Sequence, residues 1–201
     1  MTEVLSGISG PDELRRLNQL FPDRYPYLLQ STAHDDGLGR FDILFAFPGD
    51  SLVLEQIREL NGPHAGNRTK FLSALDAWWE EERVAAREST LPFLGGWFLY
   101  LGYELAAEIE PSLQLHNDPQ LPTAFAVRCP VAIVYDHVRQ QCSLVCEDKS
   151  EQDAAQIHRD IAQLASNQPK IKSRTLTVTD DPPFLALMTL CRSSVTQRVC
   201  V

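Results

Sequence analysis

Cysteine and histidine, the residue types with the most versatile side-chain chemistry, are spread thinly over this sequence. Five of each occur in 201 residues, without a CxxC pair. Cys142 and Cys146 are expected to share one face of an extended segment, since strand side chains alternate. Four residues along a strand separate two thiolates too far for one tetrahedral zinc ion, and no histidine follows at ligand spacing. The pattern predicts free thiols in a reducing compartment and no metal centre.

The histidines and the densest acidic run are expected to face solvent. The histidines stand in loop-like or surface-like contexts: His34, His64, His116, His137 and His158. Glu80, Glu81 and Glu82 lie on the polar side of a segment whose apolar residues recur at helical spacing. Neither set predicts general acid–base catalysis.

The segment PFLGGWFLYLGYEL, residues 92–105, is the least ordinary part of the sequence, with three glycines and five aromatic residues. It is not a Walker A phosphate loop, because the Lys-Ser/Thr pair is missing and no helix is expected to begin there. Gly95 and Gly96 allow positive φ or a close backbone approach. The aromatic residues that follow predict a central strand that is covered on both faces.

The composition is typical of a globular protein, with 44% hydrophobic and 22% charged residues. The net charge of −9 leaves no basic surface to neutralise phosphates, which argues against nucleic-acid binding. No run approaches the roughly eighteen apolar residues that span a bilayer, and the N-terminus lacks a basic stretch followed by an apolar one. These features predict a cytoplasmic protein that binds neither nucleic acid nor membrane.

The elements that would position any site are predicted from periodicity. Amphipathic helices are expected at 10–21, 71–87 and 150–166. In the second of these, the expected buried residues are Phe71, Leu72, Leu75, Trp78, Trp79 and Val84. Strands are expected at 25–31, 40–48, 125–136, 142–146 and 174–179, with a polar turn at 32–39. The segment 51–59 fits both a strand and a helix.

The order of these elements indicates a fold class. Residues 125–136 and 142–146 are expected to pair as a hairpin through the polar turn at 136–141. Strands run in such clusters and are not separated one by one by helices. The sequence therefore predicts an α+β fold with a largely antiparallel sheet and flanking helices.

Four segments, in this order, together resemble the N-terminal half of the chorismate-utilising synthases. They are Leu28-Leu29-Gln30-Ser31, Gly39-Arg40-Phe41-Asp42-Ile43, the 92–105 run and Ile133–His137. The family includes component I of anthranilate synthase and of aminodeoxychorismate synthase, and the resemblance covers about residues 10–180. It implies the N-terminal part of the anthranilate synthase component I fold, with the 92–105 run packed against the catalytic half.

The resemblance also implies a tryptophan pocket. By motif match, Ser31 corresponds to the serine of that pocket, and its second segment corresponds to Leu38, Gly39, Arg40 and Phe41. A serine hydroxyl can bond a ligand's polar head, an arginine can hold a carboxylate bidentately, and a phenylalanine can stack on an indole. Without the family motif, the same residues would be interpreted as a turn serine, a surface arginine and a core phenylalanine.

The activity that the resemblance implies is amination of chorismate. The sequence Arg40-Phe41-Asp42-Ile43 is similar to the aminodeoxychorismate branch, since the anthranilate branch tends to have serine at the third position. That branch adds ammonia from a glutamine amidotransferase partner to chorismate, with Mg²⁺, giving 4-amino-4-deoxychorismate for p-aminobenzoate and folate. The alternatives are a fragment of anthranilate synthase component I, from tryptophan biosynthesis, and a non-enzymatic module that binds tryptophan or a protein partner.

The end of the sequence departs from the family pattern. Residues 1–183 match the N-terminal region, whereas 184–201 form an atypical tail that gains Cys191 and Cys200, as a frameshift or an early stop would produce. In the family, chorismate, Mg²⁺ and the catalytic acid and base belong to the C-terminal chorismate-binding domain, which finds no match here. The expectation is a transferase-family chain without catalytic residues or a cofactor of its own, inactive when alone.

Overall fold

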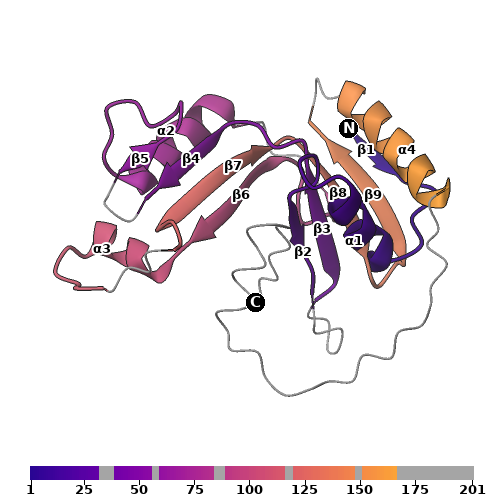
Figure 1. The fold of residues 1–201 in the computed structure, drawn as a ribbon, viewed down its shortest axis with the longest axis horizontal. Helices are drawn as coiled ribbons and strands as arrows, with labels where there is room; N and C mark the ends of the chain where they lie inside the picture. Colours follow the sequence, from indigo (N-terminus) through magenta and orange to yellow (C-terminus); the bar gives the residue numbers. More distant parts are fainter. Residues whose placement is uncertain (32–38, 56–58, 84–88, 116–119, 148–150, 167–201) are drawn as a thin grey trace, which may run out of the picture. The chain divides into compact units, whose positions relative to one another are not determined.

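The computed structural model describes residues 1–31, 39–55, 59–83, 89–115, 120–147 and 151–166. They belong to two compact units, which are drawn in Figure 1. Unit 1 takes the described residues of Met1–Phe47, Leu91–Leu94 and Val131–Val201, and unit 2 takes those of Pro48–Thr90 and Gly95–Pro130. The predicted turn at 32–39, except Gly39, and the predicted strand at 174–179 lie outside the described residues.

Unit 1 is built on sheet A, a five-stranded antiparallel sheet in the order β1-β9-β8-β3-β2. Its strands are β1 Thr2–Val4, β2 Tyr27–Leu29, β3 Phe41–Ala46, β8 Val131–Asp136 and β9 Gln141–Cys146. The predicted hairpin between β8 and β9 is confirmed, with Asp136 opposite Gln141. The two central strands, β3 and β8, pair along their whole length from Phe41 opposite Asp136 to Ala46 opposite Val131.

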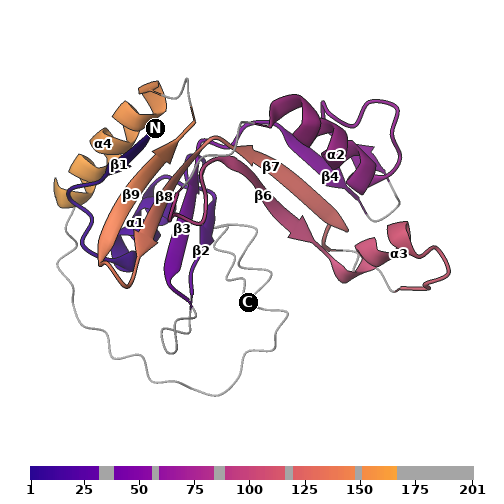
Figure 2. The ribbon, with the colours of Figure 1, turned by 180° about the vertical axis from the view of Figure 1, so that it is seen from behind.

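Two helices, α1 Pro11–Leu20 and α4 Glu151–Ser166, cover one face of sheet A (Figures 1 and 2). Proline at the first helical position and acidic residues in the first turn begin α1 as predicted. Apolar side chains of both helices are buried on the sheet, among them Leu14 and Leu17 of α1 and Ile157 of α4, each 0% exposed. Cys142 and Cys146 lie in the same core, so their predicted shared face is confirmed.

Unit 2 is built on sheet B, a four-stranded antiparallel sheet in the order β5-β4-β7-β6. Its strands are β4 Ser51–Leu54, β5 Leu60–Asn61, β6 Gly96–Leu101 and β7 Ala124–Cys129. The ambiguous segment 51–59 thus begins as a strand. One helix, α2 Phe71–Glu82, covers one face of the sheet, and Phe71, Ala74 and Trp78 are buried between them.

Three sequence predictions about unit 2 are wrong in part. Trp79 is 45% exposed, because neighbouring positions on a helix cannot both face the core and Trp78 takes the inward one. Strand β6 is an edge strand among the described strands of sheet B, not a central one. The predicted strand at 125–136 is divided at Pro130, so that β7 joins sheet B and β8 joins sheet A. Proline lacks the N–H that a continuous ladder would need there.

The 92–105 run is divided between the units. Phe93 packs edge-on against Phe45 of sheet A, with ring centroids 5.0 Å apart, whereas Gly96 begins β6. Gly95 and Gly96 both take positive φ, 114° and 136°, which is the freedom that the sequence predicted for them. After β6 the chain forms a short 3-10 helix, Tyr103–Leu105, and α3 Ala106–Ile109.

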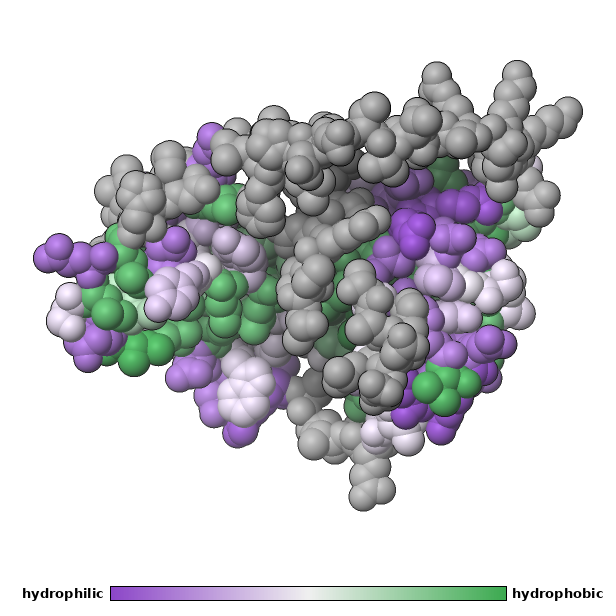
Figure 3. All heavy atoms as spheres, turned by 90° about the horizontal axis from the view of Figure 1, so that it is seen from below, coloured by the Kyte–Doolittle hydropathy of each residue, from purple (hydrophilic) through white to green (hydrophobic). Residues whose placement is uncertain are grey.

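Unit 2 exposes large apolar side chains along β6 and the segment that follows it. Leu99 and Leu101 are 44% and 52% exposed, and Tyr103 and Ile109 are 79% and 75% exposed. Figure 3 shows hydrophobic surface gathered on the part of the molecule that carries these elements, at the left of the view. None of the described helices is long and apolar enough to cross a bilayer.

Glu108 of α3 caps the start of α2, where no side chain of the helix itself does so. Its two carboxylate oxygens accept hydrogen bonds from the backbone N–H groups of Phe71 (2.6 Å) and Leu72 (3.1 Å). We expect Glu108→Ala to lower the free energy of unfolding by about 1 to 2 kcal/mol, since a capping acceptor and a favourable helix-dipole charge are both lost. Urea unfolding followed by tryptophan fluorescence measures this in unit 2.

The matched control for this cap is Glu110→Ala, two residues along the chain. Glu110 is exposed and bonds only locally, to Ser112. The control should change the free energy of unfolding by less than about 0.5 kcal/mol, as surface substitutions usually do. Equal effects of the two substitutions would contradict the capping role of Glu108.

Candidate ligand site at one end of sheet A

The residues of the predicted pocket meet at one end of sheet A. Ser31 lies two residues past the end of β2, and Gly39 and Arg40 lead into β3, which begins at Phe41. Because β2 and β3 are antiparallel neighbours, with Leu29 opposite Ile43, the end of β2 and the start of β3 lie together. The end of β8 reaches the same place, since Asp136 is opposite Phe41.

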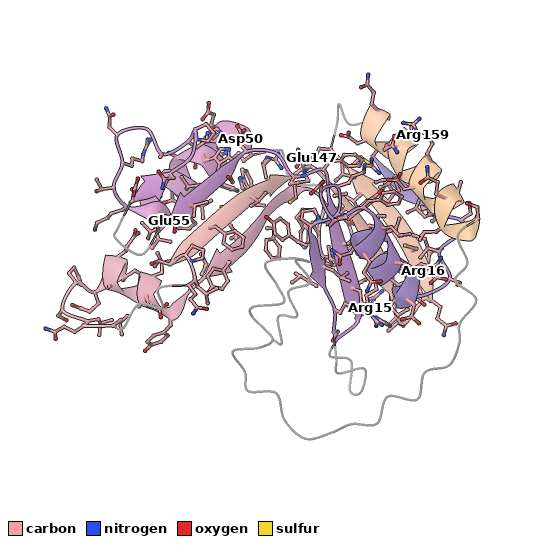
Figure 4. The ribbon with its side chains drawn as sticks, viewed as in Figure 1. Arg15, Arg16, Asp50, Glu55, Glu147 and Arg159 are labelled. Carbon is pink, nitrogen blue, oxygen red and sulfur yellow. The ribbon has the colours of Figure 1, made fainter. Side chains whose placement is uncertain are left out.

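Asp42 lies at the centre of this end of the sheet, with its side chain 2% exposed. Its Oδ1 accepts a hydrogen bond from the backbone N–H of Ser31 at 3.0 Å and lies 3.0 Å from Nε2 of His137. Its Oδ2 accepts a hydrogen bond from Nε2 of Gln30 at 3.3 Å. Arg15 of α1, labelled in Figure 4, donates in turn to Gln30 at 3.0 Å. A buried carboxylate needs such a set of donors.

Arg40 forms a bidentate ion pair with Asp136. Nη2 donates to Oδ2 at 2.6 Å, and Nε lies 3.1 Å from both oxygens. Asp136 is buried and also accepts hydrogen bonds from the backbone N–H groups of Val138 and Arg139. The hydrogen bond from Arg40 is the main cause that lowers the pKa of Asp136, and the same bond raises the pKa of Arg40. The guanidinium lies 4.7 Å from the centre of the Phe41 ring.

The lowered pKa of Asp136 predicts a loss of stability in acid. A carboxyl group whose folded pKa is depressed stabilises the fold above its unfolded pKa, about 3.9, and loses this contribution as the pH falls through the folded value. We therefore expect Asp136→Asn to be less stable than the wild type at pH 7, with the difference narrowing below about pH 4. Urea unfolding followed by far-UV circular dichroism between pH 3 and 7 measures this, with Asp12→Asn, on an exposed carboxyl, as control. A difference that stays constant with pH would contradict the prediction.

The structure describes four of the five predicted pocket residues, and it assigns them partners that the sequence did not predict. Ser31, Arg40 and Phe41 are half-buried, and Gly39 takes positive φ of 74°. Leu38 lies outside the described residues. The Arg40 side chain is 35% exposed, and its pair with Asp136 uses Nε and Nη2 but leaves the Nη1 edge for other contacts.

Sequence reasoning missed Asp42, Asp136 and His137 as members of this site. Asp136 and His137 stood in the segment that carried the family resemblance, and that was the available signal. The prediction that every histidine faces solvent is wrong for two of them. The His137 side chain is 20% exposed and faces Asp42, and that of His64 is 16% exposed and stacks on Trp78 with ring centroids 4.3 Å apart.

A second polar cluster lies in unit 2 around Glu82. The prediction that this residue faces water is wrong in part, because its carboxylate accepts hydrogen bonds from Nε1 of Trp78 and Nε of Arg128, both at 2.8 Å. His64 lies 3.3 Å from Asp50, which is labelled in Figure 4, and 3.7 Å from Glu82. These contacts join α2 to sheet B.

The cysteines of the described segments are buried and unreactive in character. Burial raises the pKa of Cys129 and of Cys142 to about 12, and that of Cys146 to about 11. A thiol with such a pKa holds its proton at neutral pH and is neither a nucleophile nor a metal ligand in that form. Within the described ranges, no group of three or more His, Cys, Asp or Glu side chains is placed to hold a metal ion.

Comparison with known proteins gives a likeness of fold. No protein-family model and no curated protein matches the chain. Among solved structures, it is similar to anthranilate synthase component I from Streptococcus pneumoniae TIGR4, at 19% identity and a TM-score of 0.46. The match covers 67% of this chain, which spans 31% of that protein's chain. The α+β class with antiparallel sheets is confirmed by the sheets themselves.

Proposed function

We propose that this chain is the N-terminal, ligand-binding part of a chorismate-utilising synthase, of the aminodeoxychorismate branch. In that branch, component I aminates chorismate to 4-amino-4-deoxychorismate with Mg²⁺ and with ammonia from a glutamine amidotransferase. The groups that perform the chemistry belong to the family's C-terminal half, so the role of these residues is to bind an amino acid and to support that half.

The proposal is supported by the motif segments together with the end of sheet A. The single observation that carries it is that Ser31, Arg40 and Phe41, the motif residues suited to an amino acid, lie at the same end of two neighbouring strands. They offer a hydroxyl, a partly exposed guanidinium and an aromatic ring, which suit the polar head and the indole of tryptophan. Asp42, on which the choice of branch rests, is buried between them and His137.

We expect the purified chain to bind L-tryptophan with a dissociation constant of about 1 mM or weaker. In the proposed complex the family's other half forms part of the pocket wall. Each wall that is missing removes apolar burial at about 25 cal/mol per Å², and an indole buries roughly 200 Å². Ser31→Ala should weaken binding, and Arg40→Ala should abolish it. NMR chemical-shift titration of the ¹⁵N-labelled chain measures affinities in this range.

The matched control for the titration is Arg139→Ala. Its side chain is 54% exposed and lies 3.9 Å from Asp136, so it removes a neighbouring positive charge without removing the proposed ligand contact. Micromolar binding that persists in Ser31→Ala and Arg40→Ala would show that the pocket is assigned wrongly. Formation of aminodeoxychorismate by the purified chain from chorismate, ammonium and Mg²⁺ would contradict the proposed division of roles.

A further inference from the structure

Ser31 is held by a side chain and not by the sheet ladder. The last pair between β2 and β3 is Leu29 with Ile43, and Ser31 lies two residues beyond it. Its backbone N–H donates to Oδ1 of Asp42 at 3.0 Å. The position of Ser31 therefore depends on where the Asp42 carboxylate lies, because this bond continues the pairing of the two strands past the end of the ladder.

The carboxylate of Asp42 is in turn contacted by the imidazole of His137, at ion-pair distance. The Oδ1 that accepts the Ser31 N–H also lies 3.0 Å from Nε2 of His137, at the end of β8. The backbone N–H of His137 donates to the carbonyl oxygen of Arg40 at 2.9 Å, and this bond holds the backbone of His137 beside the start of β3. A carboxylate that is 2% exposed keeps its orientation only while its donors are present, since an unsatisfied buried charge is costly.

Two consecutive residues at the end of β8, Asp136 and His137, thus support the two polar residues of the candidate site, Arg40 and Ser31. Asp136 holds the guanidinium of Arg40. His137 holds Asp42, and Asp42 holds Ser31. Side chains of successive strand residues point to opposite faces, but these two come where β8 ends and the turn begins, so both can serve the same end of the sheet.

We propose that Asp42 and His137 are positioning residues, which set the place of Ser31 in the ligand site through the chain His137 to Asp42 to Ser31. The inference rests on the proposed function for the identity of the ligand, L-tryptophan. The dependence of the Ser31 amide on Asp42 and His137 is testable without any ligand. Asp42 contacts Ser31, His137 contacts Asp42, and in the proposed complex the ligand contact is made by Ser31.

The test uses the full ¹⁵N-labelled chain and four variants. Asp42→Asn keeps the size of the side chain but removes its charge and one acceptor oxygen. His137→Ala removes the imidazole whose Nε2 lies 3.0 Å from Oδ1 of Asp42, and His137→Gln returns a side-chain N–H to that position. Asp160→Asn is the matched control, because Asp160 is another deeply buried, hydrogen-bonded aspartate of unit 1, lies outside the site and is 1% exposed.

The first readout is hydrogen exchange of the Ser31 amide without ligand. A lost hydrogen bond of about 1.4 kcal/mol corresponds to a tenfold change, so exchange should accelerate about tenfold in Asp42→Asn and His137→Ala. It should stay within about threefold of the wild type in His137→Gln and in Asp160→Asn. Exchange at Ser31 that is unchanged in both Asp42→Asn and His137→Ala overturns the inference, whatever the tryptophan titration gives.

The second readout is the tryptophan titration of the same samples. The initial slope of the shift change should fall about tenfold in Asp42→Asn and His137→Ala and recover in His137→Gln. If exchange of the Ser31 amide accelerates but the tryptophan affinity stays the same, the position of Ser31 does not affect binding and the inference is wrong. If the wild type shows no tryptophan-induced shifts while the Ser31 amide responds as expected, the proposed function fails and the support of Ser31 by Asp42 and His137 stands.

Discussion

Replacing Trp78 by alanine should lower the free energy of unfolding of unit 2 by about 4 kcal/mol. Trp78 is 1% exposed and lies with Phe71 and Ala74 between α2 and sheet B. Truncation of a buried tryptophan removes its apolar burial and leaves a cavity that the neighbouring side chains fill only in part. Small domains are stable by about 5 to 15 kcal/mol, so this change removes much of what holds the unit folded.

Two specific contacts of Trp78 add to this cost. Nε1 donates to Glu82 at 2.8 Å, and the ring stacks on His64 with an interplanar angle of 10°. Trp78→Phe keeps most of the apolar volume but loses the donor, so we expect it to cost about 1 to 2 kcal/mol. The comparison of the two variants separates packing from the hydrogen bond.

The control for Trp78 stands beside it on the same helix. Trp79 is 45% exposed, so Trp79→Ala should cost less than about 1 kcal/mol. All three tryptophans of the chain, Trp78, Trp79 and Trp97, belong to unit 2, and two remain in each variant as fluorescent reporters of urea unfolding. If Trp79→Ala were as destabilising as Trp78→Ala, the assignment of the core face of α2 would be wrong.

The two tryptophans also show what periodicity predicts and what it does not. Apolar spacing located α2 and its polar face, but consecutive apolar residues leave open which one turns inward, and that is decided by contact with sheet B. The break at Pro130 was missed because residues 125–136, FAVRCPVAIVYD, are mostly apolar and rich in branched and aromatic side chains, as one strand would be. The proline was the signal, since a central strand does not tolerate it.

The polar contacts of the candidate site were not predictable in the same way. Arg40 and Asp136 are 96 residues apart, and they meet because β3 pairs with β8 in one register. A shift of β3 by one residue against β8 would turn Arg40 to the face opposite Asp136. The motif located Ser31 and Arg40, but their partners Asp42 and Asp136 follow from strand pairing, which local patterns do not fix.

Replacing Asp160 of α4 by alanine should lower the free energy of unfolding of unit 1 by about 3 kcal/mol. Asp160 is 1% exposed and joins α4 to the segment that precedes β2. Its Oδ2 accepts hydrogen bonds from the hydroxyl of Tyr25 and from Nη1 of Arg24, both at 2.6 Å, and its Oδ1 accepts one from Gln156 at 2.8 Å. Removal of the carboxylate leaves the fully buried Tyr25 hydroxyl without this acceptor.

Most of the unfolding free energy lost in Asp160→Ala should come from the buried hydroxyl of Tyr25. Tyr25 is 0% exposed, and burial, followed by the bond to Asp160, raises the pKa of its hydroxyl above the usual value. A raised folded pKa stabilises the fold below the unfolded value of about 10, and this contribution is lost as the pH rises above it. The wild type should therefore lose stability in alkali, whereas a chain with Tyr25→Phe should lose less.

The double variant Asp160→Ala with Tyr25→Phe decides between two accounts of this network. If the orphaned hydroxyl is the main cost, removing it as well should recover about 1 kcal/mol or more relative to Asp160→Ala alone. If the ion pair with Arg24 is the main cost, the double variant should be no more stable than the single one. The Arg24 side chain is 31% exposed and can reach water, which is why we expect the first result. Urea unfolding followed by far-UV circular dichroism measures it, with the exposed Asp23→Ala as control.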